Sequence, residues 1–155
     1  MGIKIALFIT LLMYALVISQ SFFYILAMSS TMKKMQAGTY IETRNLLTRR
    51  LEIPLRWIYY MAMAFSLLLT SFCVVNPSGV LFISSMIALL ALVADALLAV
   101  KGNIPINKAI ESWSQTSYPS DWQNYRNKWL SRYRVRQALN IAGFISLLAG
   151  WVFGI

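Results

Sequence analysis

The sequence predicts an all-α fold, a bundle of four transmembrane helices in up-down order with short amphipathic interfacial helices in two of its connections. Two observations carry this prediction. Hydrophobic residues make up 59% of the chain and charged residues 12%, whereas soluble domains carry ~25% charged residues. The apolar residues also form four long runs, so we expect a single membrane domain over residues 1–155.

The four runs cover residues 5–28, 55–75, 79–100 and 137–155. Each has about 19 to 24 residues, and ~20 helical residues cross the ~30 Å hydrocarbon core of a bilayer. Helices are expected because backbone groups in lipid must form hydrogen bonds within their own segment. The run after Lys4 is longer than the apolar part of a signal peptide and has no clear small-x-small cleavage site, so it is interpreted as a true span.

Basic residues are confined almost entirely to two connections, and this fixes the expected orientation. Of the 14 Lys and Arg residues, six lie between the first two spans or at the edge of the second, seven follow the third, and Lys4 remains. The positive-inside rule then places connections 29–54 and 101–136 in the cytoplasm and both termini on the non-cytoplasmic side of a plasma or bacterial inner membrane. The net charge of +9 lies against the spans, which favours membrane lipids over nucleic acid as partners.

The connection 101–136 has the pattern of two helices. Gly102 is expected to end the third span, and Pro105 to open a short helix. A capping box formed by Ser120 and Gln123 then starts a helix that runs into the fourth span. One face of this helix carries Trp122, Tyr125, Arg126, Trp129 and Tyr133. The face is interpreted either as an aromatic belt at headgroup depth or as a lid that contacts a flat aromatic ligand.

The connection 29–54 has a similar element. A capping box of Thr39 and Glu42 precedes several apolar residues and predicts a short surface helix that attaches this connection to the membrane.

Polar residues from all four spans fall in the half of the bundle next to these connections, so a site is expected there. Asp95 is the most informative, because a carboxylate inside a span is costly and normally faces the bundle interior or a partner. Two interpretations remain open for it. It is either a proton acceptor or a structural group, which forms an ion pair with Arg136, Arg56 or Lys101 or reaches the headgroups.

The residue types argue against several chemistries. The chain has no His and one Cys, Cys73, which lies inside a span. Zinc, His-ligated haem, iron–sulfur and dithiol chemistry are therefore not expected, and neither a metal nor a cofactor is predicted. Ser146, Gly150 and Gly154 form a stripe of small residues on the last span, which serves close packing either within the bundle or in a homo-oligomer.

Residues 103–136 contain a set of spaced motifs. They are Asn-Ile-Pro-Ile-Asn at 103–107, Trp113, Pro-Ser-Asp-Trp at 119–122, Arg126, Trp129 and Arg136. This pattern resembles the anthrone-oxygenase-like family of small four-helix membrane proteins, which share an Asn-x-Pro-x-Asn step, a Pro-x-x-Trp and a spaced Arg and Trp before the fourth helix. The four-span layout is similar over the whole chain. Members of that family often carry a His close to the fourth span, and this chain has none.

The resemblance implies oxidation of anthrones to anthraquinones by O₂, with no metal or flavin. Asp95 would remove a proton from a flat phenolic, anthrone- or quinone-like substrate that enters from the cytoplasmic leaflet, and nearby donors would stabilise the resulting oxyanion. The expected catalytic residues are Asp95, Asn103, Asn107, Arg126 and Arg136. The expected substrate-binding residues are Gln20, Tyr24, Tyr59, Trp113, Trp122 and Trp129.

A second hypothesis belongs to another class. The bundle is then a non-catalytic membrane module that binds a lipid, a quinone or a partner membrane subunit through the same polar half. A transporter is a weaker third hypothesis, because four short spans with one acidic residue offer little machinery for alternating access. A catalytic site requires a cavity for a flat ring system beside Asn103, Asn107 and Asp95, whereas a structural lock would leave these groups hydrogen-bonded to one another without a void.

Overall fold

The computed structural model describes residues 2–154, which form four long helical rods. The first rod consists of α1 (Gly2–Phe23), the π-helical turn η1 (Tyr24–Met28) and α2 (Ser29–Lys34). The second is α3 (Ala37–Cys73). The third consists of α4 (Val80–Leu98), the π-helical turn η2 (Ala99–Asn103) and α5 (Ile104–Glu111), and the fourth is α6 (Trp122–Gly154). Each rod is long and apolar enough to span a membrane, which confirms the four-helix prediction.

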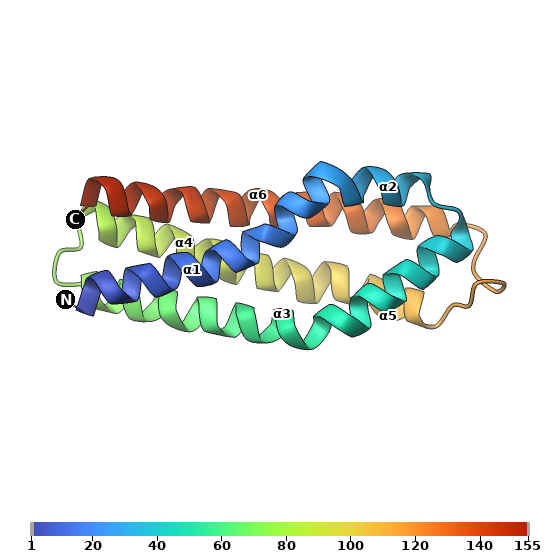
Figure 1. The fold of residues 1–155 in the computed structure, drawn as a ribbon, viewed down its shortest axis with the longest axis horizontal. Helices are drawn as coiled ribbons and strands as arrows, with labels where there is room; N and C mark the ends of the chain where they lie inside the picture. Colours follow the sequence, from blue (N-terminus) through green and yellow to red (C-terminus); the bar gives the residue numbers. More distant parts are fainter. Residues whose placement is uncertain (1, 155) are drawn as a thin grey trace.

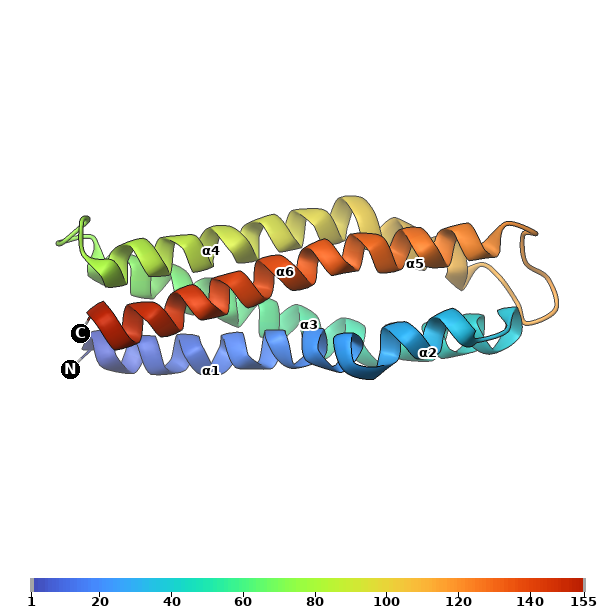
Figure 2. The same cartoon turned by 90° about the horizontal axis from the view of Figure 1, so that it is seen from above.

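The rods run lengthwise in up-down order, and both chain ends lie at the same end of the bundle (Figures 1 and 2). The first rod packs against α3, α3 against α4, α4 against α6, and α6 against the first rod, so the four close into a ring. The pairing of α4 with α6 is the most extensive. We call the end that carries the termini the proximal end and the opposite end the distal end.

The rods are longer than a bilayer requires. At 1.5 Å per residue the 37 residues of α3 extend over roughly 55 Å, compared with ~30 Å of hydrocarbon. The helices predicted to lie separately at the membrane surface are instead continuations of the spans. The segment after Thr39 is the first half of α3, and Gly102 does not end the third rod, because η2 carries the helix on into α5. The distal part of the bundle therefore projects beyond the hydrocarbon.

The rods depart from regular α-helix at two kinds of position without being interrupted there. Pro54 lies inside α3, and Figure 1 shows this helix change direction about halfway along, as expected where proline removes one backbone hydrogen bond. The π-helical turns absorb an extra residue without interrupting the helix. Neither predicted capping box starts a helix. Helix α3 begins at Ala37, before Thr39, and has no side-chain cap; α6 begins at Trp122, so the residue directly before it is Asp121 and not Ser120.

Side chains divide by depth into two buried clusters. The proximal cluster is mainly aliphatic, with Leu69, Leu92 and Leu147 among its members, and it also contains Tyr14. The distal cluster is rich in rings and includes Tyr24, Tyr40, Trp122, Trp129 and Tyr133. In the most apolar stretch of each rod only 22–39% of residues are buried, so most of this apolar surface faces outward, as lipid contact requires.

The small residues of α6 serve packing within the chain. The Ser146 hydroxyl donates to the Ser84 carbonyl (3.2 Å), and a side chain at Gly150 or Gly154 would press on Ser84 or Leu81 of α4. A Cβ atom at Gly143 would overlap the Tyr14 hydroxyl, which donates to the Ala88 carbonyl (3.0 Å). Of the two uses of the stripe, the bundle is the one that the structure shows; a homo-oligomer stays a prediction.

Gly143→Ala is expected to destabilise the bundle by about 1–3 kcal/mol, because the added methyl group must push Tyr14 out of the interface of α1, α4 and α6. Thermal unfolding in mild detergent measures the effect. Gly2→Ala is the matched control, since nothing lies within 4 Å of the added atom. Equal melting temperatures for the two variants would contradict the close packing described above.

Candidate ligand site at the distal end of the bundle

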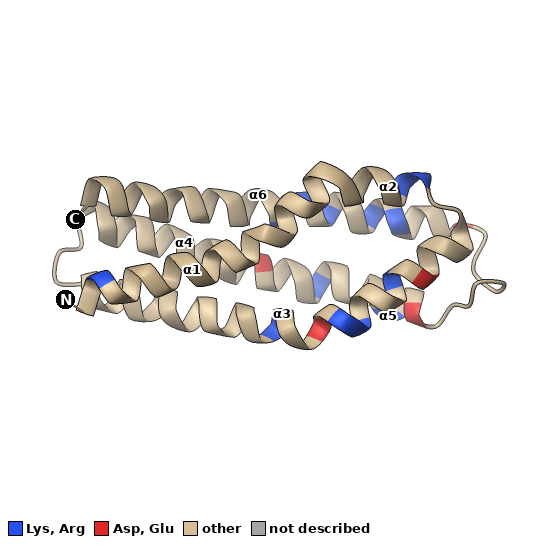
Figure 3. Cartoon of the chain, in the orientation of Figure 1, with Lys and Arg blue, Asp and Glu red and all other residues tan. Residues whose placement is uncertain are grey.

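Charged residues gather at the distal end. Figure 3 shows nearly all Lys and Arg positions in the distal half of the ribbon, and Lys4 lies near the N-terminus in the sequence. Within the same part of the bundle the described residues contain only two ion pairs, Asp95–Arg136 and Glu52–Arg56. Most Lys and Arg side chains are exposed, and the exceptions are Arg44, Arg126 and Arg136, of which Arg44 and Arg136 line the cavity described below.

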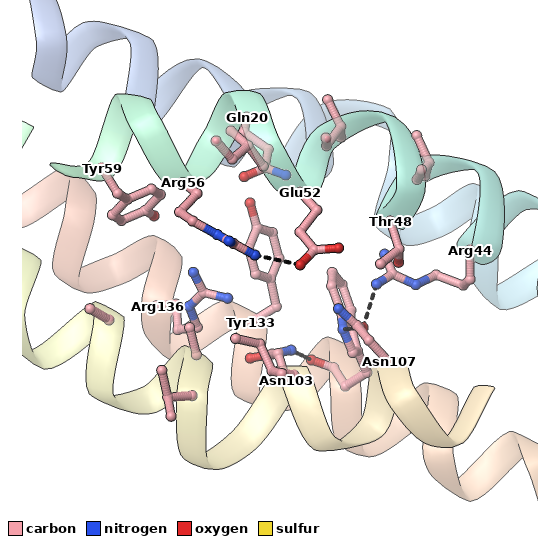
Figure 4. Close-up of a pocket in the computed structure, with 18 of the residues that line it drawn as sticks. Gln20, Arg44, Thr48, Glu52, Arg56, Tyr59, Asn103, Asn107, Tyr133 and Arg136 are labelled. Atoms are coloured by element: carbon pink, nitrogen blue, oxygen red, sulfur yellow. Dashed lines mark hydrogen bonds and ion pairs between the residues drawn. The ribbon is translucent and has the colours of Figure 1, made fainter. Parts of the chain in front are cut away.

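A cavity of about 370 Å³ opens between the four rods at this end (Figure 4). This volume lies within the ~300–1,000 Å³ range of small-molecule sites. On α3 the lining extends from Arg44 to Met63, and on the third rod from Ala96 to Glu111, so the cavity begins inside the apolar spans and ends beyond them. Its polar and aromatic lining residues are Gln20, Tyr24, Arg44, Thr48, Glu52, Arg56, Tyr59, Tyr60, Asn103, Asn107, Lys108, Glu111, Trp129, Tyr133 and Arg136.

A hydrogen-bonded group centred on Asn107 forms the distal wall of the cavity. The Asn107 side-chain oxygen accepts hydrogen bonds from the Arg44 guanidinium (2.6 Å) and from the Trp129 indole (2.8 Å). Arg44 also donates to the Tyr24 hydroxyl (3.1 Å), and its guanidinium carbon lies 4.0 Å from the centre of the Trp129 ring. The turn η1 and the helices α3, α5 and α6 each contribute one of these residues, so this group ties all four rods together.

Asn103 adds an acceptor to the same wall. It ends η2, and Pro105 follows in the first turn of α5, where a missing backbone N–H is tolerated. The four-residue spacing places Asn103 and Asn107 on one face, and both contact Trp129, since the Asn103 amide donates to the Trp129 carbonyl (3.1 Å). The Asn103 side-chain oxygen is buried and has no partner within the described residues.

The Asp95–Arg136 pair lies at the inner, membrane-side end of the cavity. Asp95 is fully buried and accepts two hydrogen bonds from Arg136, at 2.5 and 3.3 Å. Arg136 lines the cavity and Asp95 does not. Of the two interpretations of Asp95, the structure therefore shows the ion pair, with Arg136 rather than Arg56 or Lys101 as its partner. A carboxylate held in this way is poorly placed to take a proton from a ligand.

Seven of the eleven predicted site residues line the cavity: Gln20, Tyr24, Tyr59, Asn103, Asn107, Trp129 and Arg136. Besides Asp95, three do not. Arg126 donates to the carbonyls of Met32 and Met35 at the C-terminal end of α2 (3.3 and 3.5 Å), where a cation is favoured by the helix dipole. Trp122 packs on Tyr40, and Trp113 packs on Tyr125.

The aromatic face of α6 does not form a belt at headgroup depth, and only part of it reaches the cavity. Trp122, Trp129 and Tyr133 are buried among the rods and not turned toward headgroups, and of these only Trp129 and Tyr133 reach the cavity. The reason is that α6 continues along the bundle, so that its aromatic face meets the first rod and α3 and not the membrane surface.

Arg44 was not among the predicted site residues, although its position in the sequence indicates that it is buried. Arg44 lies three residues after Ile41 and three before Leu47, on the apolar face of the α3 pattern, where a charged residue is unusual. It is 4% exposed. Arg56 was considered only as a partner for Asp95, but it pairs with Glu52 (2.6 Å) at the exposed mouth of the cavity (Figure 4).

Comparisons with protein-family models, curated proteins and solved structures find no match to this chain. The described residues also contain no group of three or more His, Cys, Asp or Glu that could hold a metal ion.

Asp95→Asn is expected to destabilise the protein by about 3–5 kcal/mol, because Arg136 is left as a buried charge without its partner. Adding Arg136→Met to this variant should recover much of the loss. The free energy of unfolding in a detergent-denaturant titration measures both effects. The matched control is Glu52→Gln, which breaks the exposed pair with Arg56 and should cost at most about 1 kcal/mol. An Asp95→Asn protein as stable as wild type would refute the structural role of this pair.

Proposed function

We propose that this integral membrane protein takes a flat, acidic ring compound of the phenol, anthrone or quinol class from the bilayer and oxidises it with O₂ in the distal cavity. The observation that carries the proposal is the cavity itself. It joins apolar and aromatic walls at the depth of the spans to buried polar groups just beyond them, which is the arrangement that an amphipathic ligand requires. The activity is taken from the resemblance at residues 103–136.

Binding would use the contrast between the two ends of the cavity. Ring atoms would lie against Trp129 and Tyr133, whose stacked centroids are 4.9 Å apart, and against Tyr59 and Met63 farther into the membrane. Oxygen substituents would meet the Arg44 and Asn107 group and the free acceptor of Asn103. Apolar residues at the mouth, such as Leu55 and Val100, would let the ligand enter from the lipid side.

The chemistry follows from the acidity of such a compound. In an anthrone the CH₂ group opposite the carbonyl in the central ring would lose one proton, to water or to a carboxylate that lines the cavity, and give an enolate that a cation stabilises. The enolate transfers electrons to O₂ and forms a hydroperoxide at that carbon. Loss of water from the hydroperoxide leaves a new carbonyl, so one oxygen atom enters the product and the other leaves in water with both hydrogens of the CH₂ group. Asp95 takes no part in this reaction scheme, because it does not line the cavity. The carboxylates that do line it are Glu52 and Glu111.

The alternative is a non-catalytic module that binds a quinone or lipid in the same cavity. The group formed by Arg44, Asn107, Trp129 and Tyr24 favours this alternative in one respect, because it links four rods and would stabilise the bundle without any ligand. The oxygenase would convert the bound ring compound to an oxidised product, whereas the binding module would release it unchanged.

Purified protein in nanodiscs is expected to convert 1,8-dihydroxyanthrone to the anthraquinone faster than buffer or empty nanodiscs, with no added cofactor. The absorbance of the product and the consumption of O₂ measure the reaction. Ala96→Trp should abolish the acceleration, since Ala96 lines the cavity and an indole there fills it. Ala64→Trp is the matched control, because Ala64 lies on the exposed side of α3, away from the cavity.

The outcomes of this assay are distinct. Saturable binding without turnover, blocked by Ala96→Trp, would support the binding module instead of the oxygenase. Absence of both binding and turnover would remove ring compounds of this class from consideration.

We further propose that the distal end faces the cytoplasm and that both termini lie on the other side of a plasma or bacterial inner membrane. The support is the number of basic residues at the distal end. In a Cys73→Ser background, Ser78→Cys should react with a membrane-impermeant maleimide in intact cells, and Lys108→Cys only after permeabilisation. Both positions are exposed, so accessibility within the fold does not distinguish them. The reverse labelling pattern would invert the orientation.

A further inference from the structure

Arg44 is the only buried charged residue in the described part of the protein that lines the cavity. The two ion pairs there are Asp95–Arg136 and Glu52–Arg56, and neither includes Arg44. Its two hydrogen-bond acceptors are neutral, the amide oxygen of Asn107 and the hydroxyl of Tyr24. A guanidinium that is 4% exposed thus lies on the wall of a cavity without a negative charge beside it.

Neutral contacts satisfy this group only in part. A guanidinium has five N–H donors, of which two are used here, and the buried Nε has no partner within the described residues. The Trp129 ring, 4.0 Å from the guanidinium carbon, contributes a cation–π contact. A buried charge without a counter-ion is normally unfavourable, so this arrangement is typical of a site in which the counter-ion is supplied by a ligand.

Arg126 shows what a purely structural buried arginine looks like in the same protein. It is also buried, at 8% exposed, and it stacks on Trp122. Its donors, however, point to backbone carbonyls at the end of α2, and it does not line the cavity. The two residues therefore share burial, an aromatic neighbour, a buried Nε without a partner and the lack of a carboxylate in contact, and they differ in that only Arg44 lines the cavity.

We infer that Arg44 is the anion-binding residue of the distal cavity, and that the ligand is a ring compound bound through an ionised oxygen, a carboxylate or a phenolate. This inference rests on the proposed function and narrows its ligand class. Arg44 holds the charged oxygen beyond the membrane surface, while the apolar body of the ligand extends toward Tyr59 and Met63 in the spans.

Two probes of nearly equal shape test the inference, 9-anthracenecarboxylate and the uncharged 9-anthracenemethanol. Each is titrated into protein in nanodiscs of neutral phosphatidylcholine, and energy transfer from tryptophan to anthracene reports binding. Wild-type protein should bind the carboxylate at least about tenfold more tightly than the alcohol. Arg44→Gln should remove this preference by weakening carboxylate binding, with alcohol binding changed by less than about twofold.

Two control variants isolate the effect of the charge at position 44. Arg126→Gln removes a buried arginine outside the cavity, and Arg134→Gln removes an exposed arginine that does not line it. Both should keep the preference for the carboxylate. Arg44→Lys retains the charge but not the planar fork, and it should keep a reduced preference. If Arg44→Gln does not fold, Arg44→Lys and the wild-type preference decide the result.

Equal binding of the two probes by wild type, or a full preference in Arg44→Gln, would overturn the inference. Ala96→Trp distinguishes failure of this inference from failure of the proposed function. If wild type binds both probes equally and Ala96→Trp binds neither, the probes occupy the cavity, and only the role of Arg44 is refuted. A final arm adds phosphatidylglycerol to the nanodiscs. If that lipid displaces the carboxylate from wild type but not from Arg44→Lys, the anion is a lipid headgroup and the assignment to a ring compound is wrong.

Discussion

Charge buried in an apolar bundle has to be met by a partner, because neither lipid nor aliphatic side chains solvate it, and the distal end is organised around three such charges. Arg136 has a carboxylate, Asp95, on the neighbouring rod. Arg126 has the carbonyl groups at the end of α2. Arg44 contacts the amide of Asn107, the hydroxyl of Tyr24 and the indole ring of Trp129. Each arrangement joins rods that are distant in sequence, so the same contacts that satisfy charge also fix how the rods sit against one another.

Helix length decides where the site lies. Spans of the minimum length would have brought the polar groups to the membrane surface, under flat connecting helices. Because each rod continues beyond the hydrocarbon, the cavity has an apolar part at span depth and a polar part outside it. This gradient along one cavity, and not any single residue, is what makes an amphipathic ring compound a better match than a water-soluble ligand. The close packing of α4 on α6 at the proximal end leaves the distal end as the place where the rods can separate.

The candidate site could be predicted in part. Asn103, Asn107 and Trp129 were expected from the family resemblance of residues 103–136, and the structure brings the two Asn residues onto one face, against Trp129, because four residues make about one helical turn. Asp95 was identified as buried and polar, yet the sequence left open whether it faces a ligand or an arginine, and the structure shows Arg136. Arg126 and Trp122 lie on the predicted face of α6, but that face packs against the first rod and α3, so it is unavailable to a ligand.

Composition and apolar run length by themselves determined that this chain forms four spanning helices with its polar groups at one end, because the hydrocarbon thickness and the cost of unpaired backbone groups allow little else. Only the tertiary structure decided which of those polar groups meet. Arg44 and Asn107 are 63 residues apart in the chain, and Asp95 and Arg136 are 41 apart. Each residue along a helix turns the side chain by about 100°, so their contact depends on how whole rods rotate and bend, at Pro54 and at the π-helical turns, which no local pattern specifies.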